Sequence, residues 1–149
     1  MPPPVAHILV VEDDIDHTTL IMRALEEHGI TDSIARVGDG EAAIDYLEQR
    51  NAYADPQSAT RPHLVLLDLN LPKYSGLEVL RYIKTSSHLN TIPVVILTTS
   101  DAETDRLRAY DEHANAYVTK PVDFDRFSAM IRDLGQFWAV WNVTQRITP

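Results

Sequence analysis

Five short, mainly apolar segments recur along this chain, and a helix-like segment follows each of them. They are Ile8–Val11, Ser33–Val37, Leu64–Leu67, Val94–Leu97 and Ala116–Val118. Most contain no charged residue, which is typical of parallel strands covered by helices on both faces. The regular alternation of strand and helix predicts an α/β fold, a doubly wound five-stranded parallel sheet.

Capping and turn residues mark where the helices between these strands begin. Asp39 and Asp123 each precede an amphipathic segment and are predicted to cap it. Ser100 and Glu103 have the spacing of a capping box. Asn51–Pro62 contains turn residues without a clear period, which predicts a long surface loop.

Length and composition are those of one soluble globular domain. The chain has 149 residues, of which 44% are hydrophobic and 23% charged. The absence of cysteine excludes disulfides, thiolate catalysis and cysteine-ligated zinc. No apolar run is long enough to span a membrane, and residues 1–4 do not resemble a signal peptide, so we expect a cytoplasmic protein. The net charge of -9 argues against a nucleic-acid partner.

Polar residues follow four of the predicted strands. They are Glu12-Asp13-Asp14, Asp68, Thr98-Thr99-Ser100 and Lys120-Pro121. Because parallel strands end at the same edge of a sheet, where open α/β sheets bind ligands, these groups are predicted to meet there. Glu12, Asp13 and Asp68 would be close neighbours if the strand order were 2-1-3-4-5.

A group of carboxylates next to a lysine and a hydroxyl suits a divalent cation and a phosphoryl group. Oxygen ligands favour Mg²⁺, Mn²⁺ or Ca²⁺ over zinc, and phosphate oxygens commonly complete a Mg²⁺ site. Asp68 could act as a nucleophile that forms an aspartyl phosphate, with Lys120 and Thr98 contacting the phosphate. A cis bond before Pro121 would aim the lysine inward.

Each of these residues taken alone has a simpler structural interpretation. A single acid after a strand is usually a helix cap, and Asp14 or Asp16 is expected to be one. A Lys-Pro pair is mostly a turn signal. The occurrence of all of them, in order, at four strand ends favours a functional site.

Together, these residues resemble the receiver domain of two-component response regulators. The motifs are Val10-Val11-Glu12-Asp13, Leu67-Asp68-Leu69-Asn70-Leu71-Pro72 with Gly76, Leu97-Thr98-Thr99-Ser100 and Tyr117-Val118-Thr119-Lys120-Pro121. Asp68 and Thr98 are thirty residues apart, and Thr98 and Lys120 are twenty-two apart, both typical of the family. The resemblance implies a flavodoxin-like receiver fold, with strand order 2-1-3-4-5, and a signalling protein without enzymatic turnover of its own.

The resemblance also implies a role for each matching residue. Asp68 would be the phosphoacceptor, and Thr98 and Lys120 would contact the phosphoryl oxygens. The Mg²⁺ ligands (Mn²⁺ as an alternative ion) would be Asp13, Asp68, the backbone carbonyl of Asn70 and, through water, Glu12. Tyr117 would be the aromatic residue that rotates when the family's signalling surface switches, here about Ala102–His113, Ala116–Val118 and the last helix.

The whole chain, residues 1–149, is interpreted as one receiver domain. Its core would span about residues 7–135 and a helical extension about residues 136–149, with no output domain. The large apolar residues Phe137, Trp138 and Trp141 of the extension predict a homodimer interface. The loop before Asp68 and this tail resemble small regulators that serve bacterial phytochrome histidine kinases, which are therefore the expected partners.

Three alternatives remain at this point. A phosphatase of the haloacid-dehalogenase type would need a second aspartate where this chain has Asn70. A flavodoxin-type binding module would need a phosphate loop where this chain has the acids of Glu12-Asp13-Asp14. A receiver that signals without phosphate is the third, and the complete residue set makes it less attractive.

Overall fold

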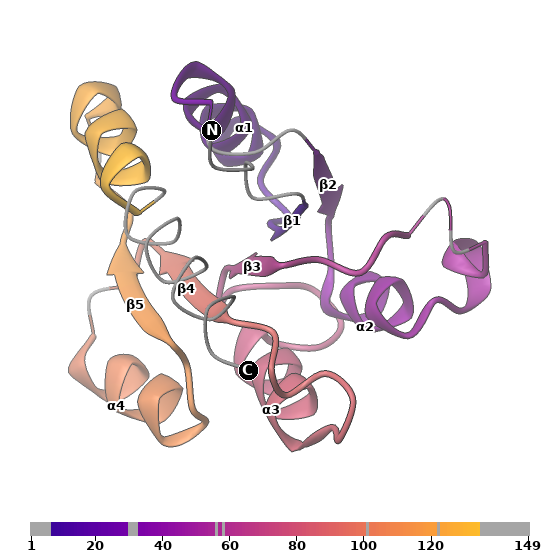
Figure 1. The fold of residues 1–149 in the computed structure, drawn as a ribbon. Helices are drawn as coiled ribbons and strands as arrows, with labels where there is room; N and C mark the ends of the chain where they lie inside the picture. The colour runs from indigo at the N-terminus through magenta and orange to yellow at the C-terminus, as the bar shows by residue number, and fades with distance from the viewer. Residues whose placement is uncertain are drawn as a thin grey trace, which may run out of the picture.

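A computed structural model describes residues 7–29, 33–55, 57, 59–100, 102–121 and 123–134. Strands and helices alternate along the chain (Figure 1). The strands are β1 (Ile8–Val11), β2 (Ile34–Val37), β3 (Leu64–Leu67), β4 (Val94–Thr98) and β5 (Ala116–Thr119). The helices are α1 (Ile15–Glu27), α2 (Gly40–Glu48), the 3-10 turn η1 (Asn51–Tyr53), α3 (Gly76–Thr85) and α4 (Glu103–Asp111). Residues 124–134 are also helical and are called the final helix below.

The five strands form one parallel sheet in the order β2-β1-β3-β4-β5. This confirms the predicted fold class, and every strand lies within one residue of its predicted bounds. In the register, Val11 of β1 lies opposite Leu67 of β3, and Thr98 of β4 lies opposite Thr119 of β5. The residues that follow these strand ends therefore lie at the same edge of the sheet.

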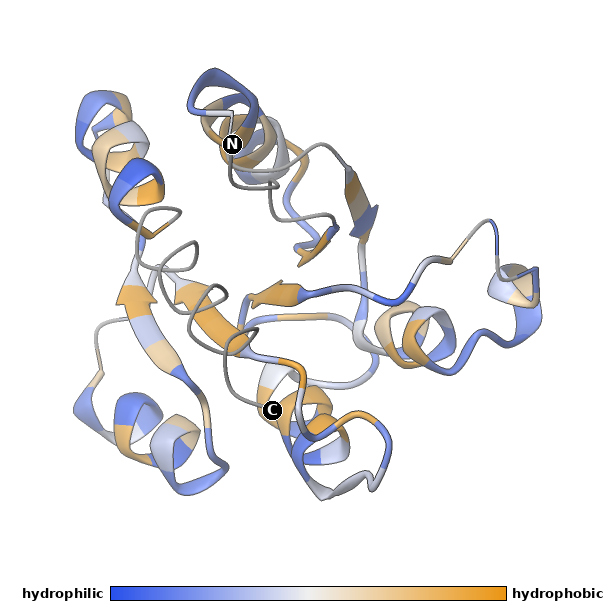
Figure 2. Cartoon of the chain, viewed as in Figure 1, coloured by the Kyte–Doolittle hydropathy of each residue, from blue (hydrophilic) through white to orange (hydrophobic). Residues whose placement is uncertain are grey.

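Alternate residues of each central strand enter two separate hydrophobic cores. Leu9 and Val11 of β1 belong to the core under α2, α3 and α4. Ile8 and Val10 belong to the core under α1 and the final helix. This follows from the two-residue period of a strand, and it explains why β1, β3 and β4 are apolar at nearly every position. Figure 2 shows the central strands as the most hydrophobic part of the chain, with helices hydrophobic only on one side.

Side-chain caps start several of the helices, although one predicted cap is wrong. Asp14 caps α1 and Asp39 caps α2, each accepting from a backbone N–H of the first turn. Asp123 accepts from the backbone N–H of Asp125 at 2.7 Å, just before the final helix. The capping box at Ser100 does not form, because α4 begins at Glu103 after Ala102. The Ser100 hydroxyl instead donates to Asp105 Oδ2 at 2.6 Å, a contact inside the loop and first turn.

Two other expectations differ from the structure. The predicted loop Asn51–Pro62 contains the short helical turn η1 at its start. No cis peptide bond occurs among the described residues, so the bond before Pro121 is trans.

None of the helices within the described ranges is long and apolar enough to cross a bilayer. The predicted extension with Phe137, Trp138 and Trp141 lies outside the described residues.

Gly76 allows the start of α3 to pack directly against the backbone of Asp68. Its backbone N–H donates to the carbonyl of Leu69 at 2.9 Å, which folds the loop after β3 back on itself. A Cβ atom at this position would lie 2.1 Å from the Asp68 carbonyl oxygen and 2.6 Å from Leu69 Cα. Because both atoms belong to the backbone, a side chain could be fitted only by moving the loop that carries Asp68.

We expect Gly76→Ala to lower the free energy of unfolding by about 3 kcal/mol, the upper part of the usual range for overpacking. Urea denaturation checks this. Gly38→Ala is the matched control, since its Cβ would meet only the flexible Arg36 guanidinium, at 3.2 Å. An equal loss in the free energy of unfolding for Gly76→Ala and Gly38→Ala would contradict the explanation that backbone contact at Gly76 excludes a side chain.

Candidate functional site

The sheet register brings three charged side chains together at the carboxyl edge. Glu12 follows β1, Asp68 follows β3 and Lys120 follows β5, and all three are buried. Lys120 is tied in place by its own backbone N–H, which donates to the Thr98 carbonyl at 2.7 Å. The structure therefore brings Glu12, Asp68 and Lys120 to one place, although Glu12 and Lys120 are 108 positions apart in the sequence.

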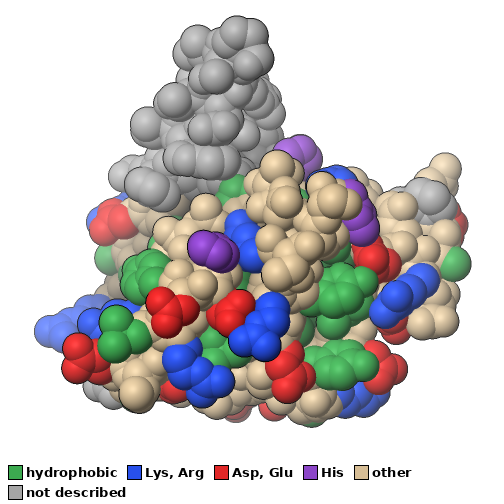
Figure 3. All heavy atoms as spheres, turned by 90° about the horizontal axis from the view of Figure 1, so that it is seen from below, with side chains coloured by type: hydrophobic (Ala, Val, Ile, Leu, Met, Phe, Trp, Pro, Cys, Tyr) green, Lys and Arg blue, Asp and Glu red, His purple; other side chains and the backbone are tan. Residues whose placement is uncertain are grey.

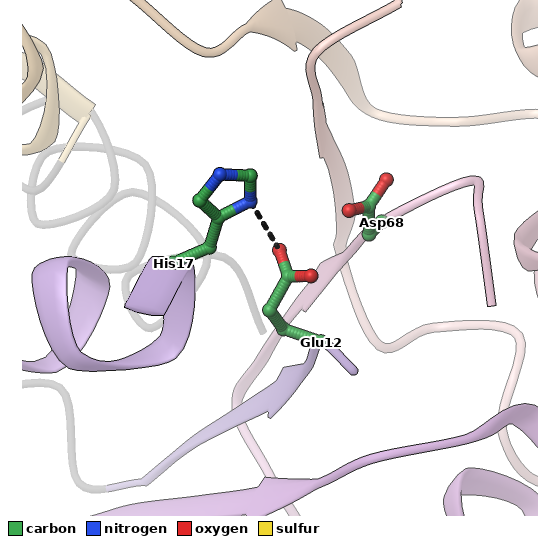
Figure 4. A group of neighbouring side chains, drawn as sticks. All are labelled: Glu12, His17 and Asp68. Atoms are coloured by element: carbon green, nitrogen blue, oxygen red, sulfur yellow. Dashed lines mark ion pairs between the residues drawn. The ribbon is translucent and has the colours of Figure 1, made fainter. Parts of the chain in front are cut away.

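The Lys120 ammonium lies at the centre of this cluster. It donates to Asp68 Oδ2 at 3.0 Å and also contacts Glu12 Oε1. Its third neighbour is His17 Nδ1, at 3.1 Å. Figure 4 shows His17, near the start of α1, and Glu12, after β1, pointing toward each other with Asp68 beside them. The polar atoms of Glu12, His17 and Asp68 lie within 4.8 Å of one another.

Glu12 is the most deeply buried carboxylate of the site, with 1% of its surface exposed. Burial raises the pKa of its carboxyl, and the nearby Asp68 charge raises it further, while Lys120 opposes both effects. Two carboxylates and one ammonium therefore share a largely enclosed volume. The site retains negative charge, so a further cation would be attracted to it.

Asp13 has a different environment from its neighbour Glu12. It is exposed, and its carboxylate is not part of the close group formed by Glu12, His17 and Asp68. The Arg36 side chain of β2 donates to the carbonyl oxygens of Glu12 and Asp13, at 3.0 and 3.2 Å. The guanidinium therefore fixes the backbone of this loop while the Asp13 side chain faces solvent, where a hydrated ion could reach it.

The loop after β3 positions the Asp68 carboxylate from the other side. The backbone N–H of Asn70 donates to Asp68 Oδ1 at 3.2 Å, and the Asn70 residue itself is exposed. Since Oδ2 faces Lys120, each oxygen of Asp68 has a donor from the chain. The carboxylate is thus held in one orientation at the mouth of the site.

Thr98 connects the site to the α4 and β5 side of the domain. It is fully buried, and its Oγ1 accepts from the Ser100 backbone N–H at 3.3 Å. The Tyr117 hydroxyl donates to the Ser100 carbonyl at 2.8 Å, and the Arg106 guanidinium lies 6.0 Å from its ring centre. Thr98 and Tyr117 therefore contact the same residue of the β4–α4 loop.

Two residues of this site were not found by sequence reasoning. His17 and Arg36 follow no strand end, and the strand-end rule could not select them. His17 lies one turn beyond the loop acids, at the start of α1, and Arg36 is the charged residue within a predicted strand. The available sequence signal was position: His17 is a possible ligand one turn after the acids, and Arg36 is a charge within an otherwise apolar strand.

The face formed by α3 and α4 carries mixed charge. Figure 3 shows basic and acidic side chains side by side on this face, with hydrophobic groups between them. Arg81 of α3 and Glu112 after α4 pair at 2.6 Å, and this hydrogen-bonded contact lowers the pKa of the Glu112 carboxyl and raises the pKa of the Arg81 guanidinium. Leu107 and Tyr110 of α4 are about half exposed. No broad basic surface of the kind that binds nucleic acid is visible on this face.

The fold and this acidic site with its buried lysine define a doubly wound α/β domain built to handle a phosphoryl group and a cation. Residues 8–132 match the response regulator receiver domain, so the chain belongs to that family. Family membership removes the phosphatase and flavodoxin-type alternatives as explanations of the fold and motifs.

Individual relatives cover most of the chain. The "Probable methanogenesis regulatory protein FilR2" of Methanothrix harundinacea is 44% identical over 135 residues, 91% of this chain and 84% of the relative. Response regulator Rcp1 of Synechocystis sp. is 40% identical over 131 residues, 88% of this chain and 87% of Rcp1. The structure of the Mn²⁺-bound form of Rcp1 has a TM-score of 0.81 at 39% identity, covering 90% and 94% of the two chains. The phosphorylated cyanobacterial phytochrome response regulator RcpA has a TM-score of 0.83 at 41% identity, covering 89% and 93%.

Replacing Lys120 with methionine leaves Glu12 and Asp68 without their shared cation. We expect Lys120→Met to lower the free energy of unfolding by about 3 kcal/mol at pH 7.5. A carboxyl whose pKa is raised in the folded state adds stability at low pH and loses it as pH rises through that pKa. The deficit should therefore shrink as the pH falls toward 5, measured by urea denaturation.

Lys73→Met is the control for this experiment. Lys73 is exposed and lies 3.7 Å from Asp39, and such a surface pair contributes at most about 1 kcal/mol. If the loss in the free energy of unfolding of Lys120→Met grew on acidification, Lys120 would not be the cation that stabilises Glu12 and Asp68.

Proposed function

We propose that Asp68 accepts a phosphoryl group from a histidine kinase. A carboxylate oxygen of Asp68 forms the new P–O bond as the P–N bond of a phosphohistidine breaks, and the imidazole leaves with the bonding electron pair. The observation that carries this proposal is the contact between Lys120 Nζ and Asp68 Oδ2 at 3.0 Å. It places a fixed positive charge beside the nucleophile, where negative charge accumulates on the transferred group.

The residues around Asp68 also fit a Mg²⁺ or Mn²⁺ ion. Glu12, Asp13 and Asp68 carry three carboxylates against one Lys120 ammonium, and a divalent cation balances the excess. All of these ligands are oxygens, and Asp13 is exposed, as a partly hydrated ion requires. Asp13, Asp68 and the Asn70 carbonyl would hold the ion directly, with Glu12 acting through water. The ion, when bound, neutralises the charge of the transferred phosphoryl oxygens.

Two relatives support this assignment. One was solved as a Mn²⁺-bound form and the other as a phosphorylated phytochrome response regulator. Both are covered almost over their full length by this chain. We therefore propose that this protein is a receiver domain of the phytochrome type, with a phytochrome-linked histidine kinase as its phosphodonor.

Incubation with acetyl phosphate and Mg²⁺ should phosphorylate the wild-type protein and not Asp68→Asn, because the amide cannot form the acyl phosphate. A phosphate-affinity gel measures the mobility shift. EDTA should remove the shift in the wild type.

Asp16→Asn is the matched control, since Asp16 is an exposed acid in the first turn of α1 and lies outside the cluster. It should retain the mobility shift. Phosphorylation of Asp68→Asn at the wild-type level would remove the proposal, and a Mg²⁺-independent shift would remove the metal assignment.

We propose that Thr98 and Tyr117 carry the signal from the site to the surface of α4, β5 and the final helix. A phosphoryl oxygen would draw the Thr98 hydroxyl toward Asp68 and away from Ser100, whose carbonyl holds Tyr117. Tyr117 would then turn inward. A ligand shifts such an equilibrium only by its different affinity for the two states, and the Thr98 contact supplies that difference.

Beryllofluoride, a phosphoryl analogue, should therefore break the bond from Tyr117 to Ser100 and change the Tyr117 rotamer. NMR of tyrosine-labelled protein, with and without the analogue, measures the change. Thr98→Ala should bind the analogue with little change at Tyr117. An unchanged Tyr117 signal in the saturated wild-type protein would exclude this switch.

Two calls stay predictions from the sequence. One is homodimerisation through Phe137, Trp138 and Trp141, and the other is a domain core of about residues 7–135. The phosphate-independent alternative is less favoured, because Asp68, Thr98 and Lys120 are brought to one edge in the arrangement that phosphoryl transfer needs.

A further inference from the structure

The Lys120 ammonium has three acceptors within reach, and one of them is an imidazole. A lysine ammonium carries three N–H donors and no lone pair. The three neighbouring acceptor atoms are Asp68 Oδ2, Glu12 Oε1 and His17 Nδ1. Because the ammonium can only donate, His17 must present a lone pair on Nδ1, which places the ring proton on Nε2. All three donors of Lys120 are then used.

The same three residues resemble a metal site, but the chain fills it with its own cation. Glu12, His17 and Asp68 have their polar atoms within 4.8 Å of one another, a spacing that would suit a transition metal. Lys120 Nζ contacts each of the three atoms. The group is therefore a cage for an ammonium, and a divalent ion is expected outside it, where the exposed Asp13 can reach it.

We infer that His17 is a positioning residue for phosphoryl transfer, holding the Lys120 ammonium in place when Asp68 is modified. This rests on the proposed function of Asp68. When a phosphoryl group replaces one lone pair of the Asp68 carboxylate, the donor that faced Oδ2 turns to a phosphoryl oxygen. The other two donors stay on Glu12 and His17, so the ammonium remains aimed at the site. Without His17, Glu12 would be the only fixed acceptor, and the Lys120 ammonium could rotate about that single contact.

Water in a cavity beside the cluster is the alternative acceptor for the Lys120 ammonium. The cavity has a volume of about 240 Å³ and is lined by His17, Leu20, Thr99, Lys120, Pro121 and Phe127. Water in this cavity could accept from Lys120 if the imidazole were absent. If water served equally well, His17 would contribute nothing to the orientation of the ammonium.

Two variants separate these cases. His17→Leu introduces an apolar side chain of similar bulk and removes the acceptor. His17→Asn retains an acceptor oxygen close to the place of Nδ1 and is the rescue variant. His63→Leu is the control, since His63 is exposed and follows the loop at the opposite end of β3. The affinity for beryllofluoride at saturating Mg²⁺ is measured by calorimetry in all four proteins.

We expect His17→Leu to weaken beryllofluoride binding about tenfold, in line with the loss of one hydrogen bond to a charged group. His17→Asn should recover most of this loss, and His63→Leu should bind as the wild type does. Thermal unfolding of the free proteins is recorded in parallel, because a structural role alone would lower the melting temperature without the rescue of affinity by asparagine. NMR of the lysine ammonium in the unmodified protein should show slow proton exchange in the wild type and His17→Asn, and fast exchange in His17→Leu.

The outcomes are distinguishable from a failure of the proposed function. If the wild type does not bind beryllofluoride, the function of Asp68 is wrong and this inference falls with it. Binding by the wild type that is unchanged in His17→Leu overturns the inference alone and indicates that water replaces the imidazole. Equal loss in His17→Leu and His17→Asn also overturns it, because an acceptor at that place would then be irrelevant.

Discussion

The buried ammonium of Lys120 is the interaction on which the site depends. Glu12 and Asp68 are brought together by adjacent strands, and without a cation between them their burial would be unfavourable. The lysine makes that burial tolerable, and in the function we propose it also prepares Asp68 to receive a negatively charged group. Structural stabilisation and phosphoryl chemistry thus use the same contact, which explains why the lysine is enclosed and has several acceptors.

The sheet and its loops hold this arrangement to a narrow geometry. The registers of β1 with β3 and of β4 with β5 place Glu12, Asp68 and Lys120 at the same edge of the sheet. Gly76 brings α3 against the Asp68 backbone, and Arg36 fixes the loop after β1 by two carbonyl contacts. On the other side, Ser100 contacts both Thr98 and Tyr117, which is the route by which the proposed switch would reach the α4 surface.

Much of the fold could be predicted because its signals are local. The apolar runs at β1 and β3 match their strands, and Asp39 and Asp123 cap the helices that follow them. The capping box at Ser100 failed because α4 begins two residues later than the spacing of Ser100 and Glu103 implies, with Ala102 at the cap position. The turn η1 was missed because a single helical turn leaves no period in the sequence.

The sequence by itself determined the strands, the polar residues that follow them and the family to which the chain belongs, because strand period and motif spacing are properties of short segments. Only the tertiary structure decided which acids face inward. Glu12 is buried and Asp13 exposed although they are adjacent, because consecutive residues leaving a strand point to opposite sides. Packing of α1 against the sheet brought His17 to Lys120, a contact across 103 residues that depends on how helix and sheet are oriented.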